Sequence, residues 1–105
     1  MLEKTVWRQY NKENNFRDFL AKFSSMEIID MIEDDKELYA VLKSKLTKKE
    51  LKLFAMDSGK LSDDEMKMEF SYDDEELQKA KFKLYKKLKQ DKTRLSFRTK
   101  AANLI

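Results

Sequence analysis

The chain of 105 residues carries a formal net charge of +3 and contains no cysteine, no histidine, no proline and a single glycine. These absences exclude a disulfide scaffold, thiolate or histidine catalysis, and every zinc site built from cysteine or histidine. A hydrophobic fraction of 41% beside a charged fraction of 41% is typical of a highly charged globular domain rather than of a disordered chain.

No uninterrupted apolar run approaches the length of about 20 residues that a membrane-spanning helix requires. The first four residues, Met1-Leu2-Glu3-Lys4, lack the apolar core and the small-residue cleavage site of a secretory signal peptide. We therefore expect a cytoplasmic protein that makes no contact with a membrane.

Charge is distributed unevenly along the chain. Residues 1–45 carry 8 basic and 9 acidic side chains, residues 46–78 carry 5 and 10, and residues 79–105 carry 10 and 1. A basic end after an acidic middle favours a polyanion or an acidic protein surface as the partner, although a solvated helix face would have the same composition.

The near absence of glycine and proline leaves few residues that form hairpins or long loops. We therefore predict an all-α fold, a small bundle of five or six helices joined by short polar turns. Phe16, Phe19, Leu20 and Phe23 follow the i, i+3, i+4, i+7 spacing of a one-sided amphipathic helix. Apolar residues between 2 and 10 precede them at similar spacing, so the region up to Phe23 forms one helix or two.

Two further apolar segments complete the N-terminal part of the chain. Ser24 or Ser25 can cap a helix over 26–32, in which the apolar residues cover more than one stripe. Asp34-Asp35 interrupts that helix, and a second helix with a wide apolar arc follows over 38–46. Apolar arcs this wide are consistent with a homodimer interface.

Three helix starts follow within 30 residues. Thr47 and Glu50 have the spacing of a capping box, in which a hydroxyl accepts from the third helical N–H and the carboxylate accepts from the N–H of the cap. The pattern recurs at Ser62-x-x-Glu65 and at Asp73-x-x-Glu76. Gly59 is placed to end the first of these helices in a left-handed conformation.

The resulting layout is a medium helix, a tight turn at the glycine, a short helix, a turn of about three residues at 71–73 and a long helix over 74–90. This is the layout of a helix-turn-helix, whose last helix lies in the DNA major groove. At about 100° per residue, three lysines of the long helix lie opposite its leucines, and Lys81 falls towards the buried side. The lysines are Lys79, Lys83 and Lys86, and the leucines are Leu77, Leu84 and Leu88.

These residues also carry a family resemblance over 46–90. The stretch Leu46-Thr47-Lys48-Lys49-Glu50, then Leu61-Ser62-Asp63-Asp64-Glu65, then Glu69-Phe70 and finally Lys87-Leu88 resembles sigma factor region 4 and the LuxR-type helix-turn-helix. The resemblance implies a helical DNA-binding domain whose last helix reads the major groove.

The start of the last helix departs from that family pattern. Four carboxylates, Asp73 to Glu76, stand where the family has small polar and basic side chains, and carboxylates repel phosphates within a Debye length of about 8 to 10 Å. All four arginines of the chain lie outside this helix, although arginine is the commonest bidentate reader of guanine. The departure keeps a second hypothesis open.

The first hypothesis is a DNA-binding transcriptional regulator with double-stranded DNA as its partner. The second is a protein-protein interaction module on the same scaffold, which contacts the transcription machinery without sequence-specific DNA binding. The basic residues of 79–100 favour the first, and the acidic start of the long helix favours the second. The candidate nucleic-acid-binding residues are Glu76, Gln78, Lys79, Lys83, Lys86, Lys87, Gln90 and Arg94.

We expect one compact domain in three parts. Residues 1–45 form an N-terminal helical segment for the core, dimerisation or partner contact, residues 46–90 the helix-turn-helix, and residues 91–105 a basic C-terminal tail. Trp7 is expected in the core rather than on a base-stacking surface, and Met26, Met31, Met66 and Met68 are expected to fill the core.

No catalytic, metal or cofactor site is expected. Without histidine or cysteine an enzyme would rely on carboxylates, lysine or tyrosine with perturbed pKa values, and the sequence groups no such residues in an apolar setting. The acidic stretch 57–65 places Gly59 third and Leu61 fifth, which breaks the spacing of a calcium loop.

Overall fold

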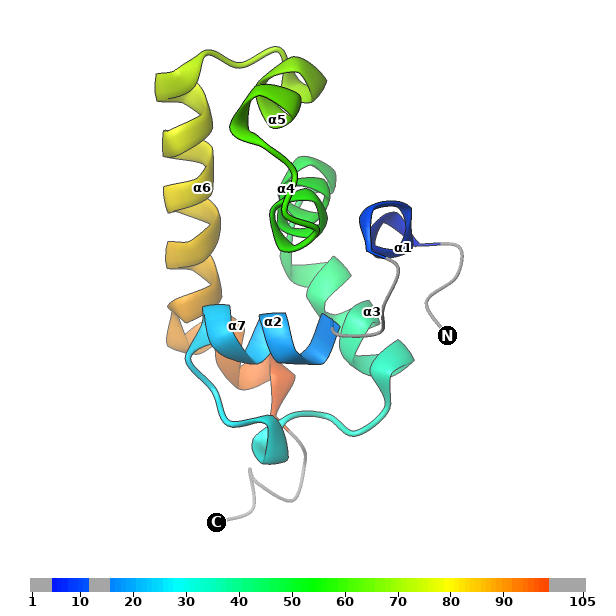
Figure 1. Cartoon of the computed structure of the whole chain (residues 1–105). Helices are drawn as coiled ribbons and strands as arrows, with labels where there is room; N and C mark the ends of the chain where they lie inside the picture. Colours follow the sequence, from blue (N-terminus) through cyan, green and yellow to red (C-terminus); the bar gives the residue numbers. More distant parts are fainter. Residues whose placement is uncertain (1–4, 12–15, 99–105) are drawn as a thin grey trace.

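The computed structural model describes residues 5–11 and 16–98, and in this part of the chain it contains α-helices, two short 3-10 turns and no β-strand (Figure 1). The α-helices are α1 (Val6–Tyr10), α2 (Phe16–Ser24), α3 (Asp35–Lys45), α4 (Lys48–Ser58), α5 (Asp63–Phe70), α6 (Asp74–Lys89) and α7 (Asp91–Arg94). The 3-10 turns are η1 (Ile28–Asp30) and η2 (Leu95–Phe97). The prediction of an all-α fold is confirmed, with more helices than the five or six expected because α1 and α2 are separate and α7 follows α6 as a short helix of its own.

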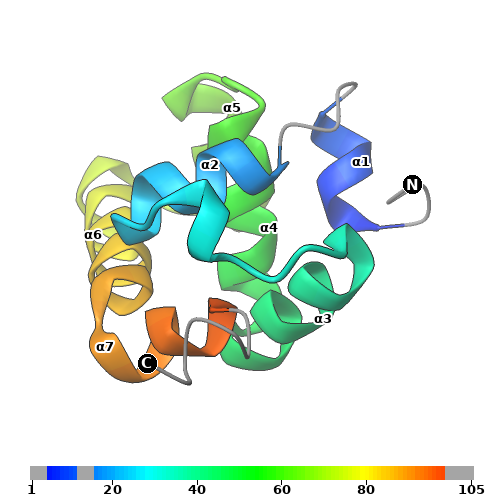
Figure 2. The same cartoon turned by 90° about the horizontal axis from the view of Figure 1, so that it is seen from below.

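Helix α4 lies at the centre of the molecule, between α1 and α6 (Figures 1 and 2). Its buried residues are Leu51, Leu53, Phe54, Ala55, Met56 and Ser58. The amide of Asn11, at the end of α1, donates to the carbonyl oxygens of Trp7 and of Ala55, each at 3.0 Å. Because this amide is buried, both bonds are shielded from water, and the bond to Ala55 fixes α1 against α4.

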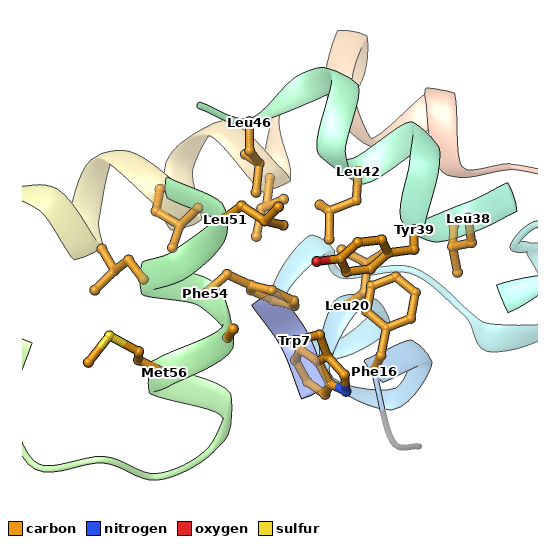
Figure 3. Packing of buried hydrophobic residues seen from close by; sticks show 14 of the residues in the cluster. Trp7, Phe16, Leu20, Leu38, Tyr39, Leu42, Leu46, Leu51, Phe54 and Met56 are labelled. Atoms are coloured by element: carbon orange, nitrogen blue, oxygen red, sulfur yellow. The ribbon is translucent and has the colours of Figure 1, made fainter. Parts of the chain in front are cut away.

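Aromatic side chains join the N-terminal helices to α4. Trp7 is buried and lies between Phe54 and Phe16, with ring centroids 5.6 Å and 5.7 Å away (Figure 3). Phe16 in turn meets Tyr39 of α3 at 5.4 Å. The core role predicted for Trp7 is confirmed.

Of the four methionines expected to fill the core, Met31 and Met66 are buried and Met26 is half-buried, whereas Met68 is 84% exposed.

The prediction of a helix over 26–32 is wrong. Ser25 has a left-handed backbone and ends α2, with the N–H of Met26 donating to the carbonyl of Ala21 at 2.9 Å. Beyond η1 the chain is extended, and the N–H of Ile32 donates to the carbonyl oxygen of Phe97 at 2.9 Å. The two serines therefore lie at the end of α2 instead of at the start of a new helix. Phe97, which is distant in the sequence, accepts the hydrogen bond of Ile32 that the prediction assigned to a helix.

Residues 91–98, expected to begin a basic tail, fold onto the core. Phe97 and Thr93 are buried, and Met31 and Arg98 form an isolated antiparallel bridge. The remainder of the predicted tail, 99–105, lies outside the described residues. The basic side chains of 91–98 are therefore presented from packed turns rather than from an arm.

The end of α4 differs from the prediction at Gly59. The left-handed residue is Lys60, with φ of 62°, while Gly59 has φ of −77°. Glycine is required for a different reason: a Cβ atom at this position would collide with the backbone carbonyl oxygen of Tyr10. The constraint comes from the close approach of α1 to α4, which local sequence does not encode.

We expect Gly59→Ala to destabilise the fold by about 1 to 3 kcal/mol, because the backbone of Tyr10 must move to admit a methyl group. Lys60→Gly should raise stability by up to about 1 kcal/mol, because it relieves the left-handed strain of a residue with a Cβ atom. Chemical denaturation of the two variants checks both signs. A loss of stability in the Lys60→Gly variant would contradict the assignment of the left-handed conformation to Lys60.

Candidate nucleic-acid interface

Helices α4, α5 and α6 begin where the sequence predicts. The side chains of Thr47 and Asp73 each accept a hydrogen bond from the third helical N–H. The carboxylates of Glu50 and Glu76 in turn accept from the N–H of the cap residue, so both capping boxes are complete. The hydroxyl of Ser62 likewise accepts from the N–H of Glu65 at 3.2 Å and opens α5. These three capping interactions fix the residue at which each helix of the candidate interface begins.

The turn between α5 and α6 spans residues 71–73, as predicted. Ser71 is left-handed with φ of 57°, and the N–H of Tyr72 donates to the carbonyl of Lys67 at 2.9 Å. This Schellman-type ending lets α6 start after only three intervening residues. The rings of Phe70 and Tyr72 stack across the turn with centroids 5.4 Å apart.

One face of α6 is buried against the rest of the molecule. Leu77, Leu84 and Leu88 are fully buried on this face, as the helical spacing predicts. Tyr85 packs against Phe23 of α2 with a centroid distance of 4.7 Å, and its hydroxyl donates a hydrogen bond to the carboxylate of Asp57. These contacts hold the opposite face of α6 towards solvent.

Lys81 lies on the partly buried side of α6, as expected, and joins all three helices. Its ammonium is 2.9 Å from a carboxylate oxygen of Asp63 in α5 and 3.5 Å from one of Asp57 in α4. Burial alone would lower the pKa of the Lys81 ammonium, but the contacts with Asp63 and Asp57 outweigh it and raise the pKa above its ordinary value. Lys81 is therefore a structural cation that is not available to a partner.

The structure divides the eight candidate residues by exposure. Glu76, Gln78, Lys79, Lys83, Lys86 and Gln90 are exposed, whereas Lys87 and Arg94 are half-buried. All except Arg94 lie on or immediately after α6. We define the outer face of α6 as the exposed residues Lys79, Phe82, Lys83, Lys86 and Lys89.

Five of the eight candidates are engaged inside the molecule, and one of them is Gln78, whose side chain contacts the carboxylate of Asp63. Glu76 belongs to the capping box, and Lys79 pairs with Glu75 at 3.1 Å. Lys87 pairs with Glu50 of α4 at 2.9 Å, and Arg94 donates to the carbonyl of Ser25 at 3.1 Å. By contrast, Lys83, Lys86 and Lys89 form no ion pair with any residue that the structure describes. The available positive charge therefore lies on the C-terminal half of α6.

The acidic start of α6 is partly neutralised. Asp74 lies 2.6 Å from the ammonium of Lys67, which also pairs with Asp64 at 3.2 Å. These two carboxylates raise the pKa of Lys67 above its ordinary value, chiefly through its hydrogen bond to Asp74. Acidic residues at the N-terminus and basic residues at the C-terminus both complement the helix dipole. The two ends of α6 thus present surfaces of opposite charge.

Phe82 is a candidate that the sequence reasoning missed. Its ring is 70% exposed in the middle of the outer face, and the Lys86 ammonium lies 6.0 Å from the ring centroid. Helical spacing alone places Phe82 on the side away from Leu77 and Leu84, so the signal was present. An exposed phenylalanine among unpaired lysines is suited to apolar contact with a base edge.

Comparisons with protein families, with curated proteins and with solved structures gave no match.

Two negative findings apply to the described residues. Within 5–11 and 16–98, no group of three or more aspartate and glutamate side chains is arranged to hold a metal ion. Nor is any helix there long and apolar enough to cross a membrane.

Glu50 should make stability depend on pH. Burial alone would raise the pKa of its carboxyl, but the Thr47 N–H and the Lys87 ammonium outweigh it and hold the pKa below its ordinary value of 4.5. A lowered folded-state pKa contributes stability above pH 4.5 that is lost as the pH falls through that lowered value. Glu50→Gln should therefore cost on the order of 1 kcal/mol at neutral pH and progressively less in acid, measured by urea denaturation. As a control, Glu33→Gln at an exposed position should change the free energy of unfolding little at any pH. A cost of Glu50→Gln that stays constant at every pH would contradict the lowered pKa of Glu50.

Proposed function

We propose that the protein is a cytoplasmic DNA-binding transcriptional regulator, in which α4, α5 and α6 act as a helix-turn-helix and α6 enters the major groove. The observation that supports this proposal best is the outer face of α6, where three unpaired lysines flank an exposed phenylalanine on a helix that starts after a three-residue turn. The sequence resemblance over 46–90 supports the same arrangement.

The C-terminal half of α6 supplies the phosphate contacts in this proposal. With 16 residues and a rise of about 1.5 Å per residue, α6 is long enough to lie along the major groove. Each lysine that meets a phosphate releases condensed counterions, so binding depends steeply on salt. Lys83, Lys86 and Lys89 fill this role, because the pairs with Glu75 and Glu50 occupy Lys79 and Lys87.

Base contacts in this proposal come from Phe82, with Gln78 and Gln90 as exposed polar neighbours on α6. A phenylalanine ring makes apolar contact with the thymine methyl group. Glu76 is held by the capping box and is therefore assigned to helix initiation rather than to base reading.

The salt dependence of DNA binding tests the phosphate contacts. We expect labelled random duplex DNA to bind with an affinity that falls steeply between about 50 and 200 mM salt, measured by fluorescence anisotropy. Replacing Lys83, Lys86 and Lys89 with glutamine should reduce the slope of log K against log salt by roughly 2 to 3. A matched control replaces the exposed Lys36, Lys43 and Lys45 of α3 with glutamine and should leave the slope unchanged. Equal loss in both variants would contradict a site on α6.

Phe82→Ala separates base contact from folding. Because the ring is 70% exposed, the substitution should change the free energy of unfolding by no more than about 0.5 kcal/mol. The same substitution should weaken DNA binding without changing the salt slope, since no charge is removed. An unaltered affinity for DNA would exclude Phe82 from the interface.

A second candidate function is binding to a protein of the transcription machinery. It is favoured by the acidic N-termini of α5 and α6 and by Met68, which is 84% exposed on α5. If the protein fails to bind DNA at low salt, pull-down assays with purified RNA polymerase subunits should show capture that Met68→Ser weakens. A homodimer through the apolar residues of 26–46 would have Ile28 and Ile29 as its large exposed apolar residues, because the other large apolar side chains of this range are buried or half-buried in the chain itself. Sedimentation equilibrium tests this proposal.

A further inference from the structure

A pocket of about 250 Å³ lies on the side of α6 next to α4, near the turn between α5 and α6. It shares Lys83 with the outer face of α6, and its other lining residues include the first turn of α4 and the stacked rings at 70 and 72. The lining residues are Thr47, Lys49, Glu50, Leu53, Phe70, Tyr72, Ala80, Lys83 and Lys87.

The interior of the pocket is mostly apolar, and stacking fixes the position of its two aromatic rings. Leu53 is buried in α4, and Phe70 and Tyr72 stack with an interplanar angle of 22° on either side of the left-handed Ser71. Ala80 of α6 also lines the pocket, and its side chain is too short to fill the space there. Two aromatic rings and a leucine around an unfilled space are suited to a flat apolar group.

Positive charge predominates among the ionisable side chains that line the pocket. Three lysines and one carboxylate line it, and the carboxylate of Glu50 already accepts from the Thr47 N–H and from Lys87, each at 2.9 Å. Lys49 and Lys83 form no ion pair with any residue within the described part of the chain. The lining therefore carries two ammonium groups without an ion-pair partner, which complement one anionic group on a ligand.

We propose that this pocket binds a small aromatic carboxylate, with its ring against Phe70, Tyr72 and Leu53 and its carboxylate near Lys83 and Lys49. The volume lies just below the usual range of about 300 to 1,000 Å³ for small-molecule sites, so the ligand has one or two rings. This inference does not rest on the proposed function, because binding is measured without DNA.

An isotope-edited NMR titration of the full chain with naphthoate tests the proposal, with neutral naphthamide as the matched ligand. We expect saturable binding of naphthoate with a dissociation constant of about 1 mM or below, and shifts centred on the amides of Phe70, Tyr72 and Ala80. Naphthamide should bind roughly two- to fivefold more weakly, because it lacks the charge. Shifts centred elsewhere, or equal affinities for the two ligands, would overturn the proposal.

Two variants and one control locate the site. Lys83→Met should weaken naphthoate roughly two- to fivefold and leave naphthamide unchanged. Lys79→Met removes the same charge from the same helix at a residue outside the pocket and should leave both affinities unchanged. Ala80→Leu should fill the space and abolish binding of both ligands, with its thermal unfolding showing that the fold is retained. Undiminished binding to a folded Ala80→Leu variant would refute the pocket.

Discussion

The packing of Phe54 inside a chain of aromatic rings is the contact on which the arrangement of the helices depends. Phe54 is fully buried on α4 and meets Trp7 of α1 at 5.6 Å and Phe23 of α2 at 5.9 Å. Phe23 then meets Tyr85 of α6 at 4.7 Å. Removing a buried phenylalanine typically costs about 3 to 5 kcal/mol, and the total stability of a domain is about 5 to 15 kcal/mol. The side chain of Phe54 therefore accounts for a large share of the free energy of unfolding.

The orientation of the outer face of α6 follows from this packing. Tyr85 and the leucines at 77, 84 and 88 direct one side of the helix inwards, so the lysines and Phe82 on the other side meet solvent. Lys81 adds ion pairs to α4 and α5 on the same inward side. The surface offered to a partner is therefore set by apolar and ionic contacts on the opposite side of the same helix.

Local signals predicted much of this structure. The capping pairs Thr47 with Glu50 and Asp73 with Glu76 act within one helical turn, so the sequence contains both partners, and the starts of α4 and α6 were correct. The spacing of Leu77, Leu84 and Leu88 likewise gave the buried face of α6. The exposure of Phe82 follows from the same spacing and could have been predicted.

The features that were missed depend on contacts between distant residues. The segment 26–32 forms a 3-10 turn in place of an α-helix, and the N–H of Ile32 donates to the carbonyl oxygen of Phe97. Gly59 is required by the carbonyl of Tyr10. The pairing of Lys87 with Glu50 joins two helices 37 positions apart and removes a candidate cation from the interface. Helical periodicity gives the face on which a residue lies, but it cannot give the partner that residue meets.

The most direct test of the central claim is an isotope-edited NMR titration of the whole chain with a short DNA duplex. If the outer face of α6 is the interface, the largest amide shifts should fall between Gln78 and Lys92, and residues of α3 should be unaffected. Shifts confined to α3 or to the acidic start of α5, or no shifts at low salt, would contradict the assignment of α6 as the DNA-contacting helix.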